Sequence, residues 1–550
     1  MREEDLRDED LRDLTATEQR VCEAFARGDE LDLRSGDPER DDPADSAGWG
    51  PERTVRAEVL AQLLLGGAQA PAPGRVPALR LDGALIEGGL DLDYAEIAYR
   101  ITLKGCHVTG PITLNHARTR QLALRSCHLA GLGAASASID GNVRLTGTQV
   151  TGLLRLDGAH IAGVLQLDAV RLCGPDGDDR PVLAADRVRV DDHIWMRSGF
   201  TAEGEVVLRG AQVGGDLDLT GARIAHPGGI ALSGSRMRVE GDVIGNDLRV
   251  QGELRVPGAA VMRTLRLWDA RLSNPGGTAL RAHGLDVGGS IHLAGGTRVE
   301  GRVSLTSVRS GGRISLRDAH LAAPGATALS MRQAQARETD LCTAHTPEGL
   351  VDLRHATLGV IQDDPATWPA DLLLDGLRYD RFETPLPAPQ RLLWLHRDRS
   401  GYAPQPFEQL ALAYRALGHE DEARTVLLAK ERVRHRALPW YARLWGAVQD
   451  ATVGYGYRPT RAGAWLLGLL AVGSTVFEAC PATPNKDAGT VIFSPVIFTL
   501  DHLLPVVGFG QGAAFTPTPG TQWLGYVLTA AGWILATTIA TGITRSVNRP

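Results

Sequence analysis

Aromatic side chains are scarce in this sequence, whereas glycine is abundant. The 550 residues include 64 Gly but only 9 Phe and 9 Tyr. Glycine weakens helix interiors and aromatic side chains commonly fill globular cores, so a mainly helical protein is not expected. No strict Gly-X-Y period is present, which excludes collagen. With 43% hydrophobic and 22% charged residues, the chain has the composition of a folded protein and not of a disordered one.

Motifs that carry chemistry are also missing. The sequence contains no Walker A loop, G-x-S-x-G elbow, H-E-x-x-H motif or kinase signature, and its one glycine triplet, at 508, 510 and 512, opens no βαβ unit. The six cysteines form no C-x-x-C pair, and none has a histidine at ligand spacing, which argues against a disulfide framework or a zinc site. We therefore predict no catalytic residue, no cofactor and no metal, and lean against an enzyme.

Charge is unevenly distributed along the chain. The formal net charge is −7, and residues 1–45 alone hold 17 acidic and 7 basic side chains. We interpret residues 1–48 as an acidic, partly disordered arm that stays solvated. The rest of the chain is only slightly basic, so no nucleic-acid partner is expected. The N-terminus has acidic residues where a signal peptide needs basic and then apolar ones, which predicts that most of the chain remains in the cytoplasm.

A short repeat dominates residues 73–387. Its unit is aliphatic-x-Leu-x-x-small-x-aliphatic, as in residues 79–86, 90–97 and 101–108, and it recurs with a period of about 11 residues. Apolar residues alternating with polar ones indicate short strands with one face inward. Such strands cannot bury a core alone, so two units are expected to form one coil of about 22 residues, and coils to stack. We predict a parallel β-solenoid, because leucine-rich repeats, the main competitor, need a helical return segment that is not seen.

Small residues have defined places in this repeat. The Ala, Cys or Gly position is interpreted as an inward corner, so Cys106 and Cys127 are predicted to be small buried residues and not reactive thiols. Glycines such as Gly88, Gly110 and Gly152 are expected at turns that need φ above zero or a close approach of neighbouring coils.

Helical patterns flank the solenoid. Residues 49–72 contain an amphipathic stretch at 53–65 that we interpret as a helix capping the open solenoid end. Residues 388–437 have the small-residue spacing of one helical hairpin of tetratricopeptide type, centred on Gly418. A single hairpin of this kind is more typical of a connector than of a peptide-binding site, because peptide grooves need several repeats.

The C-terminal region, 462–550, is predicted to be a transmembrane hairpin. Residues 462–477 form 16 uncharged, mostly apolar positions and residues 523–544 form 22. The second run is long enough to span a bilayer and the first is marginal. Residues 424–461 hold eight basic side chains against two acidic ones, so the positive-inside rule predicts a multi-pass plasma-membrane protein with both termini and the solenoid in the cytoplasm. Gly468 and Gly473 would permit close helix packing.

A basic and aromatic segment, 438–461, precedes the first apolar run. Aromatic rings and cations together suit the headgroup layer, so we predict a short interfacial helix on anionic lipid, with a helix packed on the preceding hairpin as the alternative. The predicted membrane-interface residues are Trp440, Tyr441, Arg443, Trp445, Arg458, Arg461 and Trp523.

Two stretches are similar to potassium-channel filters. Thr452 begins a complete TVGYG string, but this string precedes both apolar runs, whereas a filter must lie between them. The second stretch, in the segment 491–511, does lie between them but departs from the channel pattern. It is interpreted as a re-entrant or interfacial segment that could form a degenerate pore loop. The residues assigned to that loop are Asp501, His502, Gly508, Phe509 and Gly510.

Taken together, these parts resemble a family of actinobacterial integral membrane proteins often labelled "membrane-associated oxidoreductase", and more distantly the pentapeptide-repeat and bactofilin-like solenoids. The resemblance runs through the Leu-x-Leu-x-x-Ala repeats and residues 49–65, 406–430, 453–459, 498–511 and 531–544. It implies membrane association and an oxidoreductase activity, although no cofactor motif of such an enzyme can be placed on any residue. The solenoid relatives imply scaffolding or polymerisation.

The function expected from the sequence is a non-enzymatic, membrane-anchored scaffold or interaction platform. Its partners would be anionic lipid of the inner leaflet and either a second copy of the chain or other proteins bound through the solenoid. Arginine-rich coil faces, for example at Arg236, Arg238, Arg249, Arg255 and Arg266, are candidates for partner binding. The alternatives are a channel-like or transport protein gated by the solenoid, and an oxidoreductase.

Overall fold

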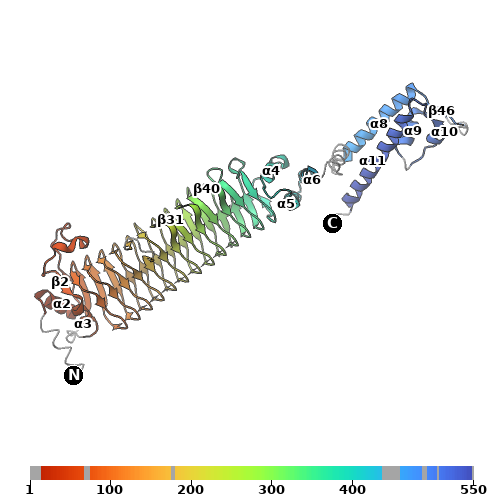
Figure 1. The fold of residues 1–550 in the computed structure, drawn as a ribbon. Helices are drawn as coiled ribbons and strands as arrows, with labels where there is room; N and C mark the ends of the chain where they lie inside the picture. Colours follow the sequence, from red (N-terminus) through yellow and green to blue (C-terminus); the bar gives the residue numbers. More distant parts are fainter. Residues whose placement is uncertain are drawn as a thin grey trace. The chain divides into compact units, whose positions relative to one another are not determined.

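The structure is a computed structural model (Figure 1) that describes residues 14–66, 75–174, 180–436, 459–485, 492–504 and 507–547. Backbone contacts divide the chain into two units. One unit runs to Pro385 and includes Arg397–Arg399, and the other comprises Leu386–His396 and the chain from Ser400. The change from strands to helices therefore falls close to the predicted boundary at residue 387.

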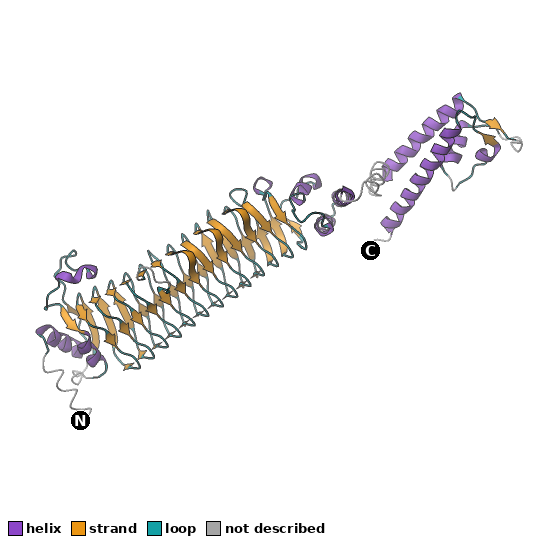
Figure 2. Cartoon of the chain, in the orientation of Figure 1, coloured by secondary structure: helices purple, strands orange, loops and turns teal. Residues whose placement is uncertain are grey.

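The first unit is a parallel β-solenoid of about 14 turns with roughly 22 residues per coil, which confirms the predicted fold class. Strands stack along the axis in two large parallel sheets (Figure 2). A coil contributes four short strands, so four ladders run along the solenoid. The first coil has β3 (Ala78–Asp82), β4 (Leu85–Glu87), β5 (Leu90–Asp91) and β6 (Glu96–Ile97), and the next has β7 (Arg100–Lys104), β8 (His107–Val108), β9 (Ile112–Thr113) and β10 (Arg118–Thr119). The four strands of each coil belong, in chain order, to the first, second, third and fourth ladders.

Equivalent residues of successive coils lie in register. On the first ladder, Leu79 pairs with Ile101 of the next coil, and Val143 pairs with Leu165 in the same way. Further along the chain, longer coils alternate with shorter ones. The ladder partners that delimit these coils are Leu217, Val243, Leu265, Ile291, Ile314, Thr339 and Ile361.

The long coils contain three 11-residue strands, each bent at a Pro-Gly turn. These strands are β28 (Arg223–Ser233), β34 (Arg271–Arg281) and β40 (His320–Ser330). The residues around each turn bulge outwards, while both ends of the strand stay paired with the neighbouring coil. These additional residues account for the greater length of the coils.

The inside of the solenoid is filled by aliphatic side chains from alternate strand residues. Strand β7 shows the pattern, with Ile101 and Leu103 buried between more exposed neighbours. Cys106 and Cys127 are buried at an inward corner, as predicted. The same corner accommodates Phe200 in a later coil, so it is not restricted to small residues. All six cysteines lie in described regions, and none of them forms a disulfide.

Two corners of most coils contain a residue with positive φ, but glycine is not always that residue. Fourteen described non-glycine residues have positive φ, among them Asp247, Asp269 and Asp318. Glycine is required instead where coils approach closely. At Gly152, a Cβ would collide with the carbonyl oxygen of Ala130 in the previous coil. The expectation of close approach is confirmed, whereas the expectation that glycine supplies φ above zero holds for only part of the corners.

The N-terminal end of the solenoid is covered by two helices. Helix α3 (Ala57–Leu64) lies within the predicted capping segment and buries Leu60, Leu63 and Leu64. The residues before it form strand β2 (Thr54–Arg56), which pairs with β4, so the predicted helix starts too early. Helix α2 (Ala16–Arg27) and strand β1 (Leu31–Asp32) lie within the predicted acidic arm and were not expected. Residues 3–13, which hold the densest acidic run, lie outside the described residues.

The second unit contains the predicted helical hairpin. Helix α5 (Pro404–Ala416) packs on α6 (Glu420–Arg436), and Gly418 between them has a φ of 80°. Helix α4 (Ala388–Leu395) precedes them, and its first amide, on Ala388, donates to the Glu422 carboxylate at 2.7 Å. The hairpin is therefore part of a three-helix cluster.

Helices also occupy the predicted membrane region. Their bounds are α8 (Pro459–Ala479), α9 (Pro495–Leu503), α10 (Gln511–Ala514) and α11 (Gln522–Val547), and a short antiparallel pair joins β46 (Thr483–Pro484) to β47 (Phe515–Thr516). None of the helices, over the residues that are described, is both long and apolar enough to cross a membrane. That α8 and α11 are transmembrane helices is therefore not confirmed.

The cap depends on a buried charge that gives a testable pH dependence. Glu18 is 1% exposed and accepts bonds from the Arg56 side chain and from the backbone amides of Thr15 and Arg56. Burial alone would raise the pKa of Glu18, but these donors lower it to about 2. The stabilisation is thus complete above the unfolded value of 4.5 and is lost as pH falls towards 2.

We predict that Glu18→Gln lowers the free energy of unfolding at pH 7 by about 2 kcal/mol, the scale of a hydrogen bond to a charged group. Denaturant unfolding of both proteins at pH 7 and pH 3 measures this. The difference should shrink at the lower pH. If the difference in free energy of unfolding between the two proteins were the same at both pH values, the ionised Glu18–Arg56 pair would not be its cause.

Candidate interaction surface

Four arginines form a column on the outside of the second ladder. They occupy the same position in four successive coils, because Arg223 pairs with Arg249, Arg249 with Arg271, and Arg271 with Arg298. Neighbouring parallel strands are about 4.8 Å apart, so four like charges follow one another at that spacing at the backbone. We call these four residues the arginine column.

Most of the arginine column has no compensating charge. Arg223, Arg271 and Arg298 are exposed, and within the described structure their side chains make no hydrogen bond or ion pair. Arg249 pairs with Asp247 at 3.3 Å, but these side chains are 40% and 58% exposed, and such surface pairs contribute little. The next residue in register is His320, whose pKa is lowered by burial and then by the charges of His345 and Arg298. The column therefore repels cations and is available to an anion.

Acidic residues lie beside this column. Asp247, Asp269 and Asp318 are exposed at the turn two residues before Arg249, Arg271 and His320 respectively. On the other side, the residues two positions after the arginines are Ala225, Gln251, Ser273 and Glu300, and Glu300 accepts a bond from Ser273 at 2.7 Å. The surface is thus a positive column with a shorter negative column next to it.

Two buried carboxylates on the solenoid have arginine partners within the chain. Glu253 is buried and binds both Arg255 and Arg281, and although burial favours a raised pKa, these donors lower it. Asp340 is equally buried and binds Arg317 at 2.8 Å. Because a buried charge needs a partner, these groups hold the coils together and are not open to ligands.

The arginines named from the sequence as candidates for partner binding lie on different faces of the solenoid. Arg238 lies on the fourth ladder, Arg249 on the second, Arg255 on the third and Arg266 on the first. Arg236 is at a corner with a φ of 56°. Arginines that are close in the sequence therefore do not form the basic surface. It is formed by arginines that occupy the same position in successive coils.

Side-chain oxygens also accept hydrogen bonds from backbone amides of the next coil. Asn142 accepts the backbone N–H of Val164 at 2.9 Å, and Asp216 accepts that of Asp242 at 2.8 Å, each from the next coil. Asp242 repeats the contact with Thr264 at 2.9 Å. These side chains link coils in the way that backbone pairs do, so they are structural.

A groove on the fourth ladder is lined in part by Gly214. It has a volume of about 460 Å³ and lies between Arg189 and Asp191 in one coil and Arg238 and Glu240 in another. Arg189 and His160 both bind the Asp191 carboxylate, each at 2.8 Å. The rim is therefore partly neutralised within the chain, which makes the groove a weaker anion site than the arginine column.

The residues predicted to form a pore loop lie around α9. The Asp501 carboxylate accepts the backbone N–H of Phe509 at 2.5 Å and that of Gly512 at 2.7 Å. Gly510 has a φ of 85° and is the N-cap of α10, while Gly508 and Phe509 are exposed. Asp501 thus anchors the loop through amide hydrogens. A conducting role of the segment stays a prediction.

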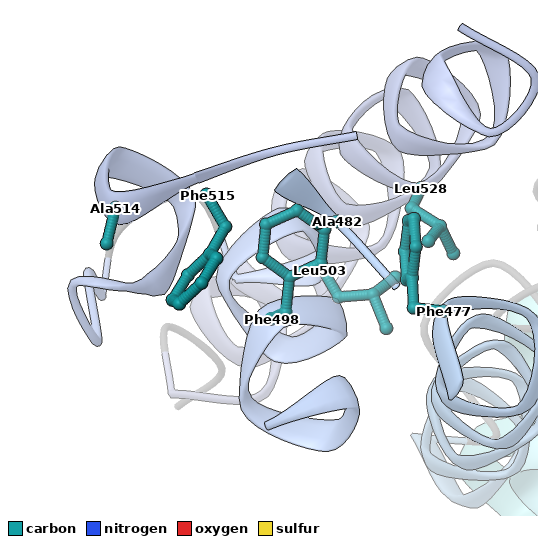
Figure 3. Close-up of a cluster of buried hydrophobic side chains, with 7 residues drawn as sticks. All are labelled: Phe477, Ala482, Phe498, Leu503, Ala514, Phe515 and Leu528. Atoms are coloured by element: carbon teal, nitrogen blue, oxygen red, sulfur yellow. The ribbon is translucent and has the colours of Figure 1, made fainter. Parts of the chain in front are cut away.

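Behind this loop, aromatic and aliphatic side chains pack α8, α9 and α11 together (Figure 3). Phe477 and Phe498 meet edge to face with ring centroids 4.9 Å apart. His502 lies against both rings and shares a hydrogen bond with the carbonyl of Phe498 at 2.9 Å. A Cβ on Gly473 would collide with the Thr499 side chain, so α8 and α9 pack closely there. A Cβ on Gly468 would meet no atom within 4 Å, so the predicted close packing is seen at Gly473 and not at Gly468.

Most of the predicted membrane-interface residues lie outside the described structure. These are Trp440, Tyr441, Arg443, Trp445 and Arg458, and the TVGYG string at 452–456 also lies there. Arg461 is in the first turn of α8, and Trp523 is 76% exposed at the start of α11.

Comparisons of the chain with protein-family models, with curated proteins and with solved structures gave no match. Among the described residues, no cluster of three or more His, Cys, Asp or Glu side chains is placed to hold a metal ion. The candidate surface therefore rests on the geometry of the solenoid alone.

Sequence reasoning missed two features, and a longer period would have revealed the first. The similar segments RIAHPGGIALS, RLSNPGGTALR and HLAAPGATALS begin at Arg223, Arg271 and His320, two coils apart each time, so two coils form one repeat. Aligning this double repeat places those three residues in one column. Gln511 was also missed: it is buried, donates to the carbonyl of Ile492 and accepts from the amide of Ser494.

The Asp501 anchor can be tested by hydrogen exchange. Asp501→Ala removes both acceptors, so we expect the amides of Phe509 and Gly512 to exchange several-fold faster. Asp501→Asn keeps one acceptor oxygen and should give an intermediate rate at one of the two amides. Exchange measured residue by residue would contradict the assignment if both amides kept their protection in Asp501→Ala.

Proposed function

We propose that this protein is a non-enzymatic interaction platform that presents its β-solenoid at the cytoplasmic face of a membrane. The observation that carries the proposal is the uncompensated arginine column. Like charges at strand spacing repel one another, and a chain gains nothing in folding from leaving them unpaired. Their repetition at one position of four successive coils supports a role in binding an anionic partner surface.

Membrane attachment is supported by the side chains that the C-terminal helices direct outwards. Leu467 and Val472 on α8, and Tyr526, Val527 and Trp533 on α11, are each more than half exposed. Exposed large apolar side chains that gather on a surface are typical of protein or membrane contact sites. We propose that this hairpin holds the chain in the plasma membrane as two transmembrane helices, with both termini in the cytoplasm.

This proposal predicts the outcome of alkaline extraction of membranes. The full chain should remain in the membrane pellet, and the double variant Leu467→Arg/Val472→Arg should move largely to the supernatant, because two charges are placed on the outward face of α8. The cluster around Phe477 is left intact. Leu412→Arg/Leu417→Arg, which alters exposed positions at α5, is the matched control and should stay in the pellet.

Two results would overturn the proposed attachment. One is a full-length chain that alkaline extraction releases from the membrane, and the other is equal release of both double variants. A reporter fused after Pro550 that was active only outside the cytoplasm would contradict the proposed orientation.

A further inference from the structure

The two charged columns on the second ladder have a spatial order that restricts what can bind them. Asp247 and Asp269 precede Arg249 and Arg271 by two residues, so in each of these two coils a negative and a positive charge lie side by side across the solenoid axis. Along the axis the signs do not alternate. Asp269 also extends over the next coil, where its carboxylate lies 2.9 Å from the position of a Cβ on Gly296.

We infer that this face pairs with the same face of a second copy of the chain, with the two solenoids parallel. The inference rests on the proposed function, since it names the partner of the platform. A two-fold axis parallel to the solenoid axes places the aspartate column of one copy opposite the arginine column of the other. It leaves positions along the axis unchanged, so each aspartate faces the arginine of the same coil in the other copy. A two-fold axis across the solenoids would place arginine on arginine.

Parallel pairing forms reciprocal ion pairs. Asp247 of either copy lies opposite Arg249 of the other, and Asp269 lies opposite Arg271, which gives four pairs from two coils. One coil further along the chain Arg298 follows, and after it Asp318 lies opposite His320. In one chain Arg249 contacts only its own Asp247. In the pair it lies between that aspartate and Asp247 of the other copy. Arg271, which is unpaired in one chain, thereby gains a carboxylate partner in two. Arg223 and Arg298 follow Gly221 and Gly296 by two residues, so the pairing gives them no carboxylate.

Other anionic partners fit this surface less well. A flat bilayer of anionic headgroups would contact Asp247, Asp269 and Asp318 as well as the arginines, and it would repel these carboxylates. Single-stranded nucleic acid is bound by aromatic side chains on which bases stack, and the residues two positions to either side of the arginine column are not aromatic. A partner with an acidic column beside a basic one matches both columns, and this chain carries that pattern itself.

The size of the face explains why membrane attachment matters. Five coils at about 4.8 Å span roughly 20 Å along the axis. Two columns of side chains over that length cover less area than the ~800 Å² per partner of a stable interface. Attachment of both copies to one membrane raises their effective concentration. Parallel solenoids also have their C-terminal ends at the same end of the pair, as two chains anchored in one membrane require.

Zero-length cross-linking of the full chain in membranes tests the inference. A carbodiimide joins a carboxylate to an amine in direct contact, and Arg271→Lys supplies an amine while keeping the charge. We expect several-fold more covalent dimer from Arg271→Lys than from Arg309→Lys, an exposed position on the fourth ladder. Asp269→Asn added to Arg271→Lys should abolish the gain, and mass spectrometry of mixed isotope-labelled copies should show a 269–271 link between copies.

Charge reversal gives a second, independent readout. Arg271→Asp and Asp269→Arg should each lower co-purification of two differently tagged copies, while the double exchange should restore it, because the columns again complement one another. Both positions are exposed and neither side chain makes an ion pair with another described residue, so folding should be preserved.

The outcomes separate this inference from the proposed function. Membrane-bound Arg271→Lys protein that gives no additional dimer overturns the pairing and leaves the platform standing. Cross-linked dimer in a chain that alkaline extraction releases upholds the pairing and overturns membrane attachment. Binding to phosphatidylserine vesicles that falls with Arg271→Asp, without any 269–271 link, identifies the column as a lipid site and overturns the pairing.

Discussion

The in-register stacking of coils is the interaction on which the rest of this structure depends. Short strands cannot be stable alone, so each is held by backbone hydrogen bonds to its equivalents in the coils before and after it. The bonds from the Leu145 amide to the Gln166 carbonyl at 2.9 Å and from the Leu167 amide to the Trp195 carbonyl at 2.7 Å show this along one ladder. Because register is fixed, every inward side chain meets its equivalent, and aliphatic residues of similar size fill the interior. The two ends of the stack lack this pairing, and at the N-terminal end α3, α2 and the Glu18–Arg56 pair take its place.

The same register turns outward side chains into columns, and this gives the solenoid its chemistry. Where a column meets buried surface, as at Glu253 and Asp340, opposite charges from neighbouring coils pair and stabilise the stack. Where the column is exposed, as at Arg223, Arg271 and Arg298, no partner is present in the described chain. The Pro-Gly turns of β28, β34 and β40 occur in the same stretch of coils, so this part of the solenoid differs in outline as well as in charge. A platform whose ligand-binding groups lie on a rigid repeat would keep their spacing fixed.

The period-2 alternation and the coil length could be predicted because they follow from burial alone. The buried Cys106 and Cys127, the cap at 57–64 and the hairpin around Gly418 follow from the same reasoning. The arginine column could not be predicted from the short sequence unit, because its four members are unevenly spaced along the chain and become equivalent only when coils of different length stack. The occupants of the left-handed corners were also misjudged: tertiary stacking imposes positive φ on residues such as His116 and Arg236, overriding their local preference. The role of Asp501 depends on the amides of Phe509 and Gly512, a contact that sequence spacing does not indicate.

The central claim, that coils stack in one continuous register, is tested most directly by a distance between two spin labels on the fourth ladder. Arg118 and Arg309 are exposed on this ladder and separated by eight coil-to-coil steps. With the exposed Cys480 and the half-buried Cys22, Cys173 and Cys342 replaced by Ser, Arg118→Cys/Arg309→Cys should give one narrow distribution at about 38 Å, which is eight strand spacings. A broad distribution, or a peak shorter by several spacings, would contradict the account.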